Sequence, residues 1–350
     1  MLSLPTLKRL LSIKLLLPLS WIYHCIVTLR NWLYDLEILK QTSFDIPVIS
    51  IGNIAVGGTG KTPMIEYLIH HFLDQKKLIA VVSRGYKRKT SGFRIATRDS
   101  TFKEIGDESY QIYRKFGDQV IVAVDEDRVK GIKRLLQEFE NLDIILLDDA
   151  YQHRRVKPQL NILLTTFIHP FYSDYGLPAG KLRESRFATK RADVVIITKC
   201  SKQIDHGHRE RIQVQMNKYK RSEVPLLFST IDYSTPHLIG GKNTVMNNNV
   251  VLITGIADAT HIEDYIRSKF NLIRHYEFRD HYNYRITDIN RLLKENETRE
   301  HISFITTQKD AAKLERFNGY FNDTLYVLPI QMTFINRDND RLITQLNFFN

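Results

Sequence analysis

The segment from Val48 to Pro63, VISIGNIAVGGTGKTP, constrains this 350-residue chain more than any other part of its sequence. An apolar run ends at Ile51, a glycine-rich turn follows, and Lys61 opens a candidate helix that continues with Pro63. This order of strand, loop and helix is the context that a phosphate-binding loop requires. Backbone N–H groups at a helix N-terminus bind phosphate oxygens, and the lysine adds positive charge. The segment therefore predicts a nucleotide-phosphate site in an α/β domain.

The loop departs from the usual pattern G-x-x-x-x-G-K-[S/T] at one position, because Ala55 stands where the first glycine is expected. The alternative is a glycine-rich turn with an incidental lysine, and the strand and helix around the loop argue against it. The threonine hydroxyl after the lysine suits Mg²⁺. We expect the nucleotide to be bound by Ala55, Val56, Gly57, Gly58, Thr59, Gly60, Lys61 and Thr62.

A second apolar run, from Asp143, ends in the two carboxylates Asp148 and Asp149. Phosphate loops work with a carboxylate at the end of a neighbouring strand, and this carboxylate holds Mg²⁺. Either aspartate could bind the metal directly or through water; alternatively, both could cap a helix or keep a loop soluble. Together with the loop, they predict a nucleoside triphosphate site with Mg²⁺.

Short apolar runs alternate with helix-length polar segments from Phe44 onward, which is typical of a parallel sheet covered on both faces. The turn-rich segment 234–249 is the best candidate for a domain boundary. We therefore expect an α/β fold with a P-loop NTPase-like domain over 41–233, built on a mostly parallel sheet. A smaller C-terminal α/β domain is expected over 234–350, with a cleft between the two.

The N-terminal segment 1–40 carries an apolar stretch, IKLLLPLSWIYHCIVTL, from Ile13 to Leu29, with basic residues on both sides. No small-residue cleavage site of a secretory signal follows it. The uncharged part is shorter than the ~20 residues that a spanning helix needs. Its tryptophans and flanking charges favour a helix lying in the membrane interface. A helix docked on the protein's own core and a true span are the alternatives.

The formal net charge is +11, and the chain contains two cysteines, Cys25 and Cys200. Two cysteines exclude a disulfide scaffold and a four-thiolate metal site, and they fit a reducing compartment. The positive charge favours polyanionic partners such as nucleic acid, nucleotide phosphates or an anionic membrane surface. No RNA- or DNA-binding motif accompanies the charge, so we expect no nucleic-acid partner, and no obligate protein partner is evident.

Further motifs follow one another along the chain. They are SRGY (from Ser83), GDE (from Gly106), DD-x-x-QH (from Asp148), LPAG-x-LRE (from Leu177), TGIA (from Thr254), DH (from Asp280) and KDA-x-K (from Lys309). Together with GN-x-x-VGGTGKTP they resemble the tetraacyldisaccharide 4'-kinases, the lipid A 4'-kinase family. The resemblance runs from Val48 to Leu314 and covers most of the chain. That family also lacks the first glycine of the loop.

The resemblance implies an enzyme that transfers the γ-phosphate of ATP to the 4'-hydroxyl of a lipid A disaccharide 1-phosphate precursor, with Mg²⁺. It implies a peripheral or monotopic protein on the cytoplasmic face of the bacterial inner membrane. By the same resemblance, Asp107 is the base that takes the hydroxyl proton, and His281 pairs with it across the cleft. Without the resemblance, Asp107 would be expected to cap the helix that follows it. The catalytic residues implied are Asp107, His281, Lys61 and Asp280.

The remaining site predictions rest on motif positions and on charge. Arginine forks suit phosphate groups, and the residues expected to contact substrate or nucleotide are Asn53, Arg84, Tyr86, Arg128, Gln152, His153 and Arg183. For the two arginines Arg84 and Arg183, ordinary surface charge is the alternative. The expected metal ligands are Thr62, Asp148, Asp149 and Glu184. Lys309 and Asp310 have no assignable role at this stage.

A membrane-associated nucleotide switch that hydrolyses its nucleotide is the alternative function. Guanine-specific switches carry an Asn-Lys-x-Asp motif, whereas the nearest strand end here is Thr198-Lys199-Cys200-Ser201, which lacks the aspartate. A nucleic-acid-dependent ATPase is suggested by the charge alone. The sequence therefore favours the kinase.

Overall fold

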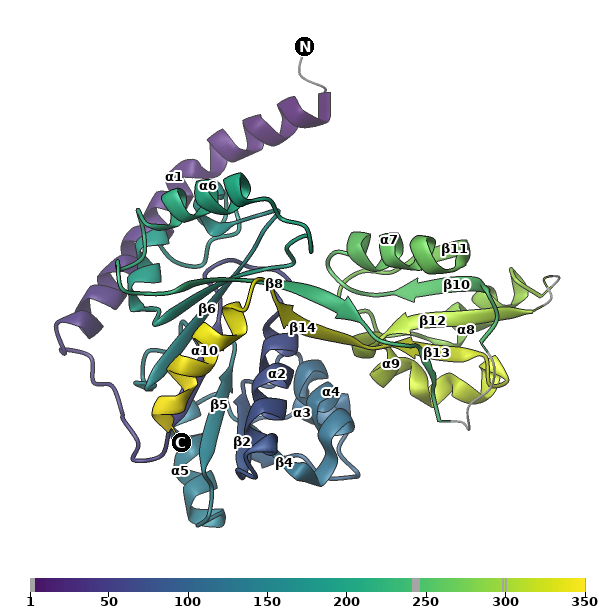
Figure 1. The fold of residues 1–350 in the computed structure, drawn as a ribbon, viewed down its shortest axis with the longest axis horizontal. Helices are drawn as coiled ribbons and strands as arrows, with labels where there is room; N and C mark the ends of the chain where they lie inside the picture. The colour runs from purple at the N-terminus through teal and green to yellow at the C-terminus, as the bar shows by residue number, and fades with distance from the viewer. Residues whose placement is uncertain (1–3, 241–245, 298, 300, 350) are drawn as a thin grey trace.

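The computed structural model describes residues 4–240, 246–297, 299 and 301–349. The chain forms a larger and a smaller α/β part that lie side by side, with the strands β8 and β14 running from the larger part toward the smaller one (Figure 1). Both parts are built on mostly parallel sheets, as the alternation of apolar runs and helical segments predicts.

The larger sheet has nine strands among the residues described, in the order β14-β8-β7-β6-β1-β5-β2-β4-β3. All neighbouring strands are parallel except β3 and β14, which pair antiparallel at the two edges. The strands are β1(Val48–Gly52), β2(Ile79–Ser83), β3(Arg94–Ile95), β4(Val120–Val124), β5(Ile144–Asp148), β6(Leu160–Thr166), β7(Val194–Thr198), β8(Leu226–Tyr233) and β14(Ile330–Phe334).

Helices cover both faces of this sheet, which is why its central strands are buried along their whole length. Successive residues of a strand point to opposite faces. Ile49 and Ile51 therefore pack with the helices α2(Lys61–Asp74) and α4(Asp107–Phe116). Val48 packs on the opposite face, with α5(Arg128–Glu138). The remaining helices of this part are α3(Phe102–Ile105), α6(His206–Met216) and α10(Asp338–Leu346).

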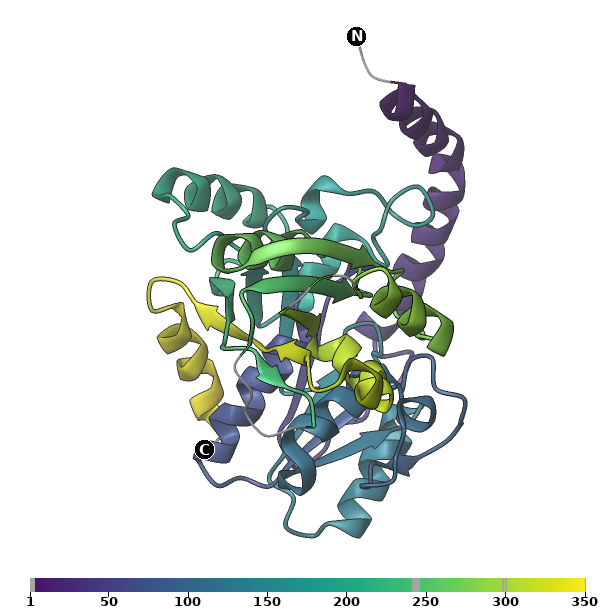
Figure 2. The ribbon, with the colours of Figure 1, turned by 90° about the vertical axis from the view of Figure 1, so that its right-hand side faces the viewer.

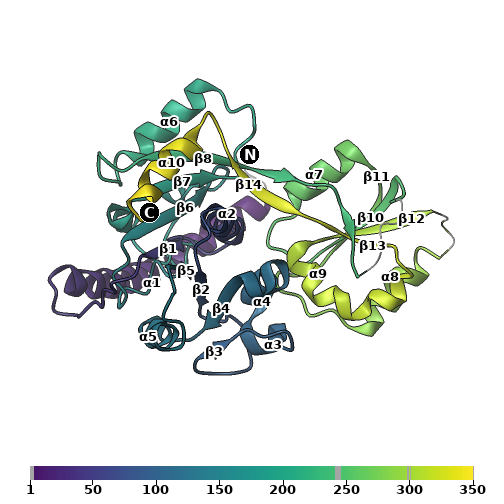
Figure 3. The ribbon, with the colours of Figure 1, turned by 60° about the horizontal axis from the view of Figure 1, so that its bottom comes forward.

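The smaller sheet has the order β11-β10-β12-β13-β9, and only β9 is antiparallel to its neighbour. In Figure 3, the helix α7(Thr260–Lys269) lies on one side of this sheet, and α8(Ile286–Lys294) and α9(Gln308–Leu314) lie on the other. Two separate apolar clusters fill these two interfaces. The strands are β9(His237–Leu238), β10(Asn249–Thr254), β11(Asn271–Glu277), β12(Ile302–Thr307) and β13(Leu325–Leu328).

The C-terminal end of the chain differs from the expected division at 234–350. The strand β14 pairs with β8 of the larger sheet, Met332 opposite Ile231, and α10 contributes Leu342 and Leu346 to the larger core. The last segment thus returns to the first domain instead of staying in the second. Part of the expected boundary segment 234–249, residues 241–245, lies outside the described residues, and the same segment contains β9 of the smaller sheet.

The N-terminal segment forms one helix, α1(Leu4–Asp35), which contains Pro18. Its C-terminal half lies against the larger part, and its N-terminal end extends beyond the rest of the molecule in both Figure 1 and Figure 2. Over the residues that the structure describes, no helix has the length and apolar character needed to cross a membrane.

Asp338 attaches the returning segment to the larger sheet and provides a test of this topology. Its Oδ2 atom accepts hydrogen bonds from the Phe228 N–H and the Arg209 guanidinium, each at 2.9 Å, and the residue is buried. Asp338→Ala leaves both donors without this acceptor, so we expect it to lower the free energy of unfolding by about 3 kcal/mol. Urea denaturation followed by circular dichroism measures the change. The exposed neighbour provides the control: Asp340→Ala should cost less than about 0.5 kcal/mol, and equal losses would contradict this account.

Candidate active site

The phosphate-binding loop joins the end of β1 to the start of α2, and two of its glycines adopt backbone conformations that other residues rarely take. Gly57 has φ 127° and Gly60, the N-cap of α2, has φ 86°. The loop is fixed from beneath by side chains. The Asn53 amide donates to Thr59 Oγ1, and the Thr198 hydroxyl at the end of β7 donates to the Thr59 carbonyl, both at 2.8 Å. The N-terminus of α2 is therefore held open for an anion.

Ala55, the residue that replaces the first glycine of the usual loop, forms an antiparallel bridge with Leu182. The next residue, Val56, donates its N–H to the Lys181 carbonyl at 2.8 Å. A glycine is not needed at this position because the backbone is extended and paired. The same pairing places Arg183 and Glu184, which follow Leu182 in the LRE motif, beside the loop.

The two strand-end carboxylates have different surroundings. Asp148 is the last residue of β5, directly opposite Ile51 of β1, and it is buried. Asp149 has φ 47° and faces Lys61 at 3.6 Å and Arg183 at 3.1 Å. Burial acts to raise the pKa of Asp149, but these two cations hold it below its ordinary value. For Asp148, burial and the negative charge of Glu108 raise the pKa to about 8.

Asp148 also has a carboxylate oxygen, Oδ1, that is buried without a hydrogen-bond partner among the described residues. A buried acceptor without a donor is costly unless a cation or a proton satisfies it. The raised pKa of Asp148 points the same way, because burial and the charge of Glu108 outweigh the opposing effect of Lys61 and Arg128. A hard divalent cation beside Thr62 and Lys61 would supply that partner, so the residues present fit such an ion.

A cleft of about 1030 Å³ separates the larger part from the smaller one. The phosphate loop and both aspartates line it from one side, α1 contributes Tyr23 and Arg30, and the smaller part contributes His281. Many of the lining side chains are cations, which favours an anionic ligand. These cations are Arg30, Lys61, Arg84, Lys87, Arg128, Arg183, Lys199 and Lys309.

Asp107 and His281 meet across the two parts. Asp107 is the first residue of α4, after Gly106, whose φ of 85° turns the chain into the helix. His281 follows β11 in the smaller part and has φ 60°. Its Nδ1 lies 2.9 Å from Asp107 Oδ2, and the Lys313 ammonium lies 2.6 Å from the same oxygen. Burial acts to raise the pKa of Asp107, but the hydrogen bonds from His281 and Lys313 lower it.

His281 presents its other ring nitrogen, Nε2, on the side of Asp280 and Lys309, both of which line the cleft with it. Asp107 thus reaches the cleft through the imidazole, and the two residues form one unit. Asp280 was predicted to be catalytic together with this pair. The Asp280 carboxylate lies 3.0 Å from the Lys309 ammonium.

The residues expected to contact substrate or nucleotide line the cleft, with the exception of Asn53. Arg84, Tyr86, Arg128, Gln152, His153 and Arg183 line the cleft. Asn53 is fully buried beneath the loop, where its amide holds Thr59 and its carbonyl accepts from Gln152, so its contacts here are structural. Burial and the neighbouring Arg84 lower the pKa of Arg128 to about 10, and burial lowers the pKa of His153 to about 4.

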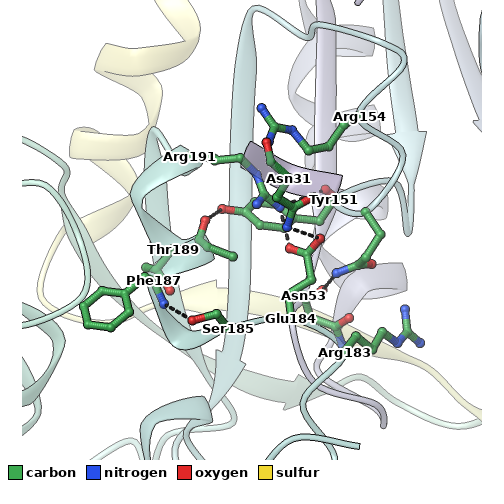
Figure 4. Close-up of polar contacts among 12 residues, drawn as sticks. Asn31, Asn53, Tyr151, Arg154, Arg183, Glu184, Ser185, Phe187, Thr189 and Arg191 are labelled. Carbon is green, nitrogen blue, oxygen red and sulfur yellow. Dashed lines mark hydrogen bonds and ion pairs between the residues drawn. The ribbon is translucent and has the colours of Figure 1, made fainter. Parts of the chain in front are cut away.

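Glu184, expected as a metal ligand, has both carboxylate oxygens engaged by protein groups. Oε2 lies 2.5 Å from the Arg191 guanidinium, and Oε1 accepts from the Asn31 amide of α1 at 3.2 Å (Figure 4). Arg191 in turn lies over the Tyr151 ring, 4.7 Å from its centroid. In this arrangement Glu184 fastens α1 to the loop that carries Arg183.

Two functional candidates were not assigned from the sequence. Lys313 belongs to the KDA-x-K motif but was not singled out, and Lys309 could not be placed. The signal was present in their spacing: residues i and i+4 share one face of a helix. What the sequence does not show is that α9 faces Asp107 of the other domain.

The comparisons with known proteins agree with this geometry. The family model described as "Tetraacyldisaccharide-1-P 4'-kinase" matches residues 12–347. A tetraacyldisaccharide 4'-kinase of Cytophaga hutchinsonii is 39% identical over 91% of this chain and 90% of its own length, and that of Parabacteroides distasonis is 41% identical over 92% and 90%. A crystal structure of LpxK from Aquifex aeolicus in complex with ATP matches with a TM-score of 0.72 and 26% identity, covering 96% of this chain and 99% of that one.

Proposed function

This chain belongs to the tetraacyldisaccharide 4'-kinase family, and from that premise we propose how its residues carry out the transfer. The reaction moves the γ-phosphoryl group of ATP to the 4'-hydroxyl of the tetraacyldisaccharide 1-phosphate, a step of lipid A biosynthesis. The observation that carries the proposal is the cleft, which has the phosphate loop on one side and the Asp107–His281 pair on the other.

The donor side of the cleft binds the triphosphate. The N–H groups at the start of α2 take the phosphate oxygens, and Lys61 supplies positive charge where the β- and γ-phosphates meet. Lys61 faces Asp149 at 3.6 Å, and this contact holds its ammonium at the site. Arg183, which also contacts Asp149, brings a second cation to the same place.

Mg²⁺ fits this side of the cleft through Thr62 and Asp148, whose Oδ1 lacks a protein donor among the residues described. When bound, the ion neutralises charge on the β- and γ-phosphate oxygens. Asp149 is the weaker candidate for direct ligation, because Lys61 and Arg183 already occupy its carboxylate. Glu184 is assigned to the attachment of α1 for the same reason.

The acceptor side activates the sugar hydroxyl. A hydroxyl is a weak nucleophile at neutral pH and needs a base placed within hydrogen-bond reach. The 4'-oxygen bonds to the γ-phosphorus, the bond from that phosphorus to the β–γ bridging oxygen breaks, and ADP leaves. The hydroxyl proton passes to the Asp107–His281 pair at His281 Nε2, which faces the cleft, once the hydroxyl has replaced the Lys309 ammonium as the donor to that nitrogen. Because the pair joins the two parts, it forms only when the cleft is closed, and closure keeps water from the γ-phosphate.

The lipid reaches the cleft from the side of α1. Tyr23, Val27 and Arg30 of this helix line the cleft, whereas other apolar side chains of the helix are exposed. An exposed apolar row near cationic side chains suits insertion into the interface of an anionic membrane. We place the protein on the cytoplasmic face of the inner membrane, where ATP is present. The exposed apolar residues are Leu15, Leu19, Trp21, Ile22, Ile26, Leu29 and Trp32.

Transfer of ³²P from γ-labelled ATP to tetraacyldisaccharide 1-phosphate in detergent micelles, with lipid-free ATP hydrolysis measured in parallel, tests this function. We expect labelled lipid, and little ATP hydrolysis when the lipid is left out. Lys61→Ala should abolish transfer, because it removes charge stabilisation from the transition state. Hydrolysis without labelled lipid would instead favour the nucleotide switch. Near-wild-type turnover of Lys61→Ala would remove the assignment of the loop.

Asp107→Ala should lower kcat by roughly 10²–10⁴, the range for loss of a positioned base, while ATP affinity changes little. Asp107→Asn keeps the shape of the side chain but not its charge, and it should be similarly impaired. The matched control is Asp118→Ala, which removes an exposed carboxylate from the end of the same helical segment. If Asp107→Ala mainly lowered the melting temperature and left kcat intact, the residue would serve only the start of α4.

Replacing Trp21, Ile22 and Ile26 with serine should weaken binding to anionic vesicles at least about tenfold, because it removes apolar area that would enter the interface. The docking contacts of α1 are retained, so the melting temperature should not change. The control replaces two exposed apolar residues elsewhere, Val214 and Tyr320. Co-sedimentation with the vesicles measures binding. Equal binding of both variants would contradict an interfacial α1.

A further inference from the structure

The helix α9 carries the KDA-x-K motif and contacts every residue of the proton-accepting site. It follows β12, and the Thr307 hydroxyl accepts from the Asp310 N–H at its start. Three of its side chains contact the pair or the backbone that carries it: Lys309 contacts Asp280 and His281, Asp310 the backbone at Gly255, and Lys313 Asp107. Each of the three motif residues that had no role assigned from the sequence, Lys309, Asp310 and Lys313, thus has a contact in the structure.

Asp310 attaches α9 to the segment that carries His281. It is fully buried, and its Oδ2 accepts from the Gly255 N–H at 2.8 Å. The Gly255 carbonyl in turn accepts from the His281 N–H at 3.1 Å. A Cβ at Gly255 would lie 2.8 Å from Asp310 Oδ1 and 2.9 Å from the Tyr284 hydroxyl, so only glycine allows this approach. The backbone of His281 is therefore fixed with respect to α9.

Lys309 determines which nitrogen of His281 carries a proton. Its ammonium lies 3.1 Å from Nε2 and is anchored by Asp280 Oδ1 at 3.0 Å. An ammonium has only donors, so Nε2 must be the acceptor. The proton of the neutral ring then sits on Nδ1, where it is donated to Asp107. The Nε2 lone pair is on the cleft side and is held by the Lys309 ammonium, so a hydroxyl can donate to it only by replacing that ammonium.

Lys313 acts on the other member of the pair. Its side chain is 2% exposed, and its ammonium lies 2.6 Å from Asp107 Oδ2, the oxygen that also accepts from His281. A buried lysine is stable as a cation only beside an anion. The contact therefore requires Asp107 to be ionised. This agrees with the pKa of the Asp107 carboxyl: burial acts to raise it, but the contacts with His281 and Lys313 lower it. No described residue donates to the second oxygen, Oδ1.

We propose that Lys309 and Lys313 are positioning residues that fix the protonation states of the pair: Lys313 keeps Asp107 a carboxylate, and Lys309 keeps His281 Nε2 unprotonated until the substrate hydroxyl replaces its ammonium there. This inference rests on the proposed role of Asp107 and His281 as the base. It gives the KDA-x-K motif a function that acts through other residues and not through contact with the substrate.

The charges around His281 show why a cation is needed. The groups that face the imidazole are Asp107 from α4, Asp280 from its own loop, Lys309 from α9 and the ring of Tyr86, whose centroid lies 5.5 Å away. Two carboxylates favour the doubly protonated imidazolium, which cannot accept a proton. The Lys309 cation opposes them. Removing it should favour the imidazolium form of His281, which is inactive as a base.

The pH dependence of kcat tests Lys309, with the lipid substrate and ATP saturating. Lys309→Met should lower kcat at pH 7 by about tenfold or more, and the loss should shrink as pH rises, because Nε2 then loses its proton. Lys309→Arg keeps the cation and should restore most of the activity. The control is Lys269→Met, which removes an exposed lysine from α7. A loss of the same size at every pH, or no loss, would overturn the proposal for Lys309.

Imidazole ¹⁵N spectra of histidine-labelled protein report which nitrogens of His281 are protonated. A purely structural role of Lys309 would not change this protonation. The His281 signal, assigned by comparison with His281→Gln, should show protonated Nδ1 and unprotonated Nε2 in the wild type. At pH 7, Lys309→Met should increase the fraction with both nitrogens protonated. A wild-type ring with its proton on Nε2, or an unchanged spectrum in the variant, would contradict the inference.

A double-mutant cycle tests Lys313 even if its burial makes the single variant less stable. If Lys313 acts through the charge of Asp107, Lys313→Met should lower kcat in the wild type but have little further effect in Asp107→Asn. Additive losses would overturn this assignment. The alanine variants of Asp107 and His281, compared with the lysine variants, distinguish a wrong base from a wrong role of α9. If Asp107→Ala and His281→Ala keep wild-type kcat, the proposed base is wrong; if they lose it and the lysine variants do not, only the role of α9 is wrong.

Discussion

The hydrogen bond between Asp107 and His281, 2.9 Å long, is the contact on which the active site depends. Its two residues belong to the larger and the smaller part, and they lie 174 positions apart in the chain. Two strands, β8 and β14, link the parts, because the chain enters the smaller sheet after β8 and returns through β14. Such a two-strand connection restricts how the parts can move more than a single linker would. The acceptor half of the site is therefore assembled by the topology.

The donor half of the site could be predicted from the sequence because it is local. A parallel sheet brings the carboxyl ends of adjacent strands together, so the order of β1 and β5 places the phosphate loop beside Asp148. The return of β14 was missed because a short antiparallel edge strand leaves little signal in the sequence. The partners of Glu184, Asn31 and Arg191, could not be predicted for a related reason: they come from a helix and a loop whose docking no local pattern shows.

The contacts of Glu184 also connect α1 to the site. Asn31 and Arg30 bind α1 to Glu184 and to the Gln152 carbonyl, and both partner residues line the cleft together with the carboxylates at the end of β5. Polar contacts fasten the inner side of the helix, while its apolar side chains stay exposed. A helix held by hydrogen bonds on one side can enter a membrane interface without leaving the protein. Under the proposed interfacial role of α1, this helix would set the distance between the lipid and the phosphate loop.

Charge placement separates the carboxylates of the cleft by role. Asp148 has a buried oxygen, Oδ1, without a protein donor among the described residues, and burial and the charge of Glu108 raise its pKa. Asp149 and Asp107 have lowered pKa values, although both are largely buried. Burial alone would raise all three pKa values, so the difference comes from the close contacts of the other two carboxylates: Lys61 and Arg183 beside Asp149, and His281 and Lys313 beside Asp107. A phosphoryl transfer site needs this division, because the residue that binds a cation must lack one and the residue that supports the base must stay ionised.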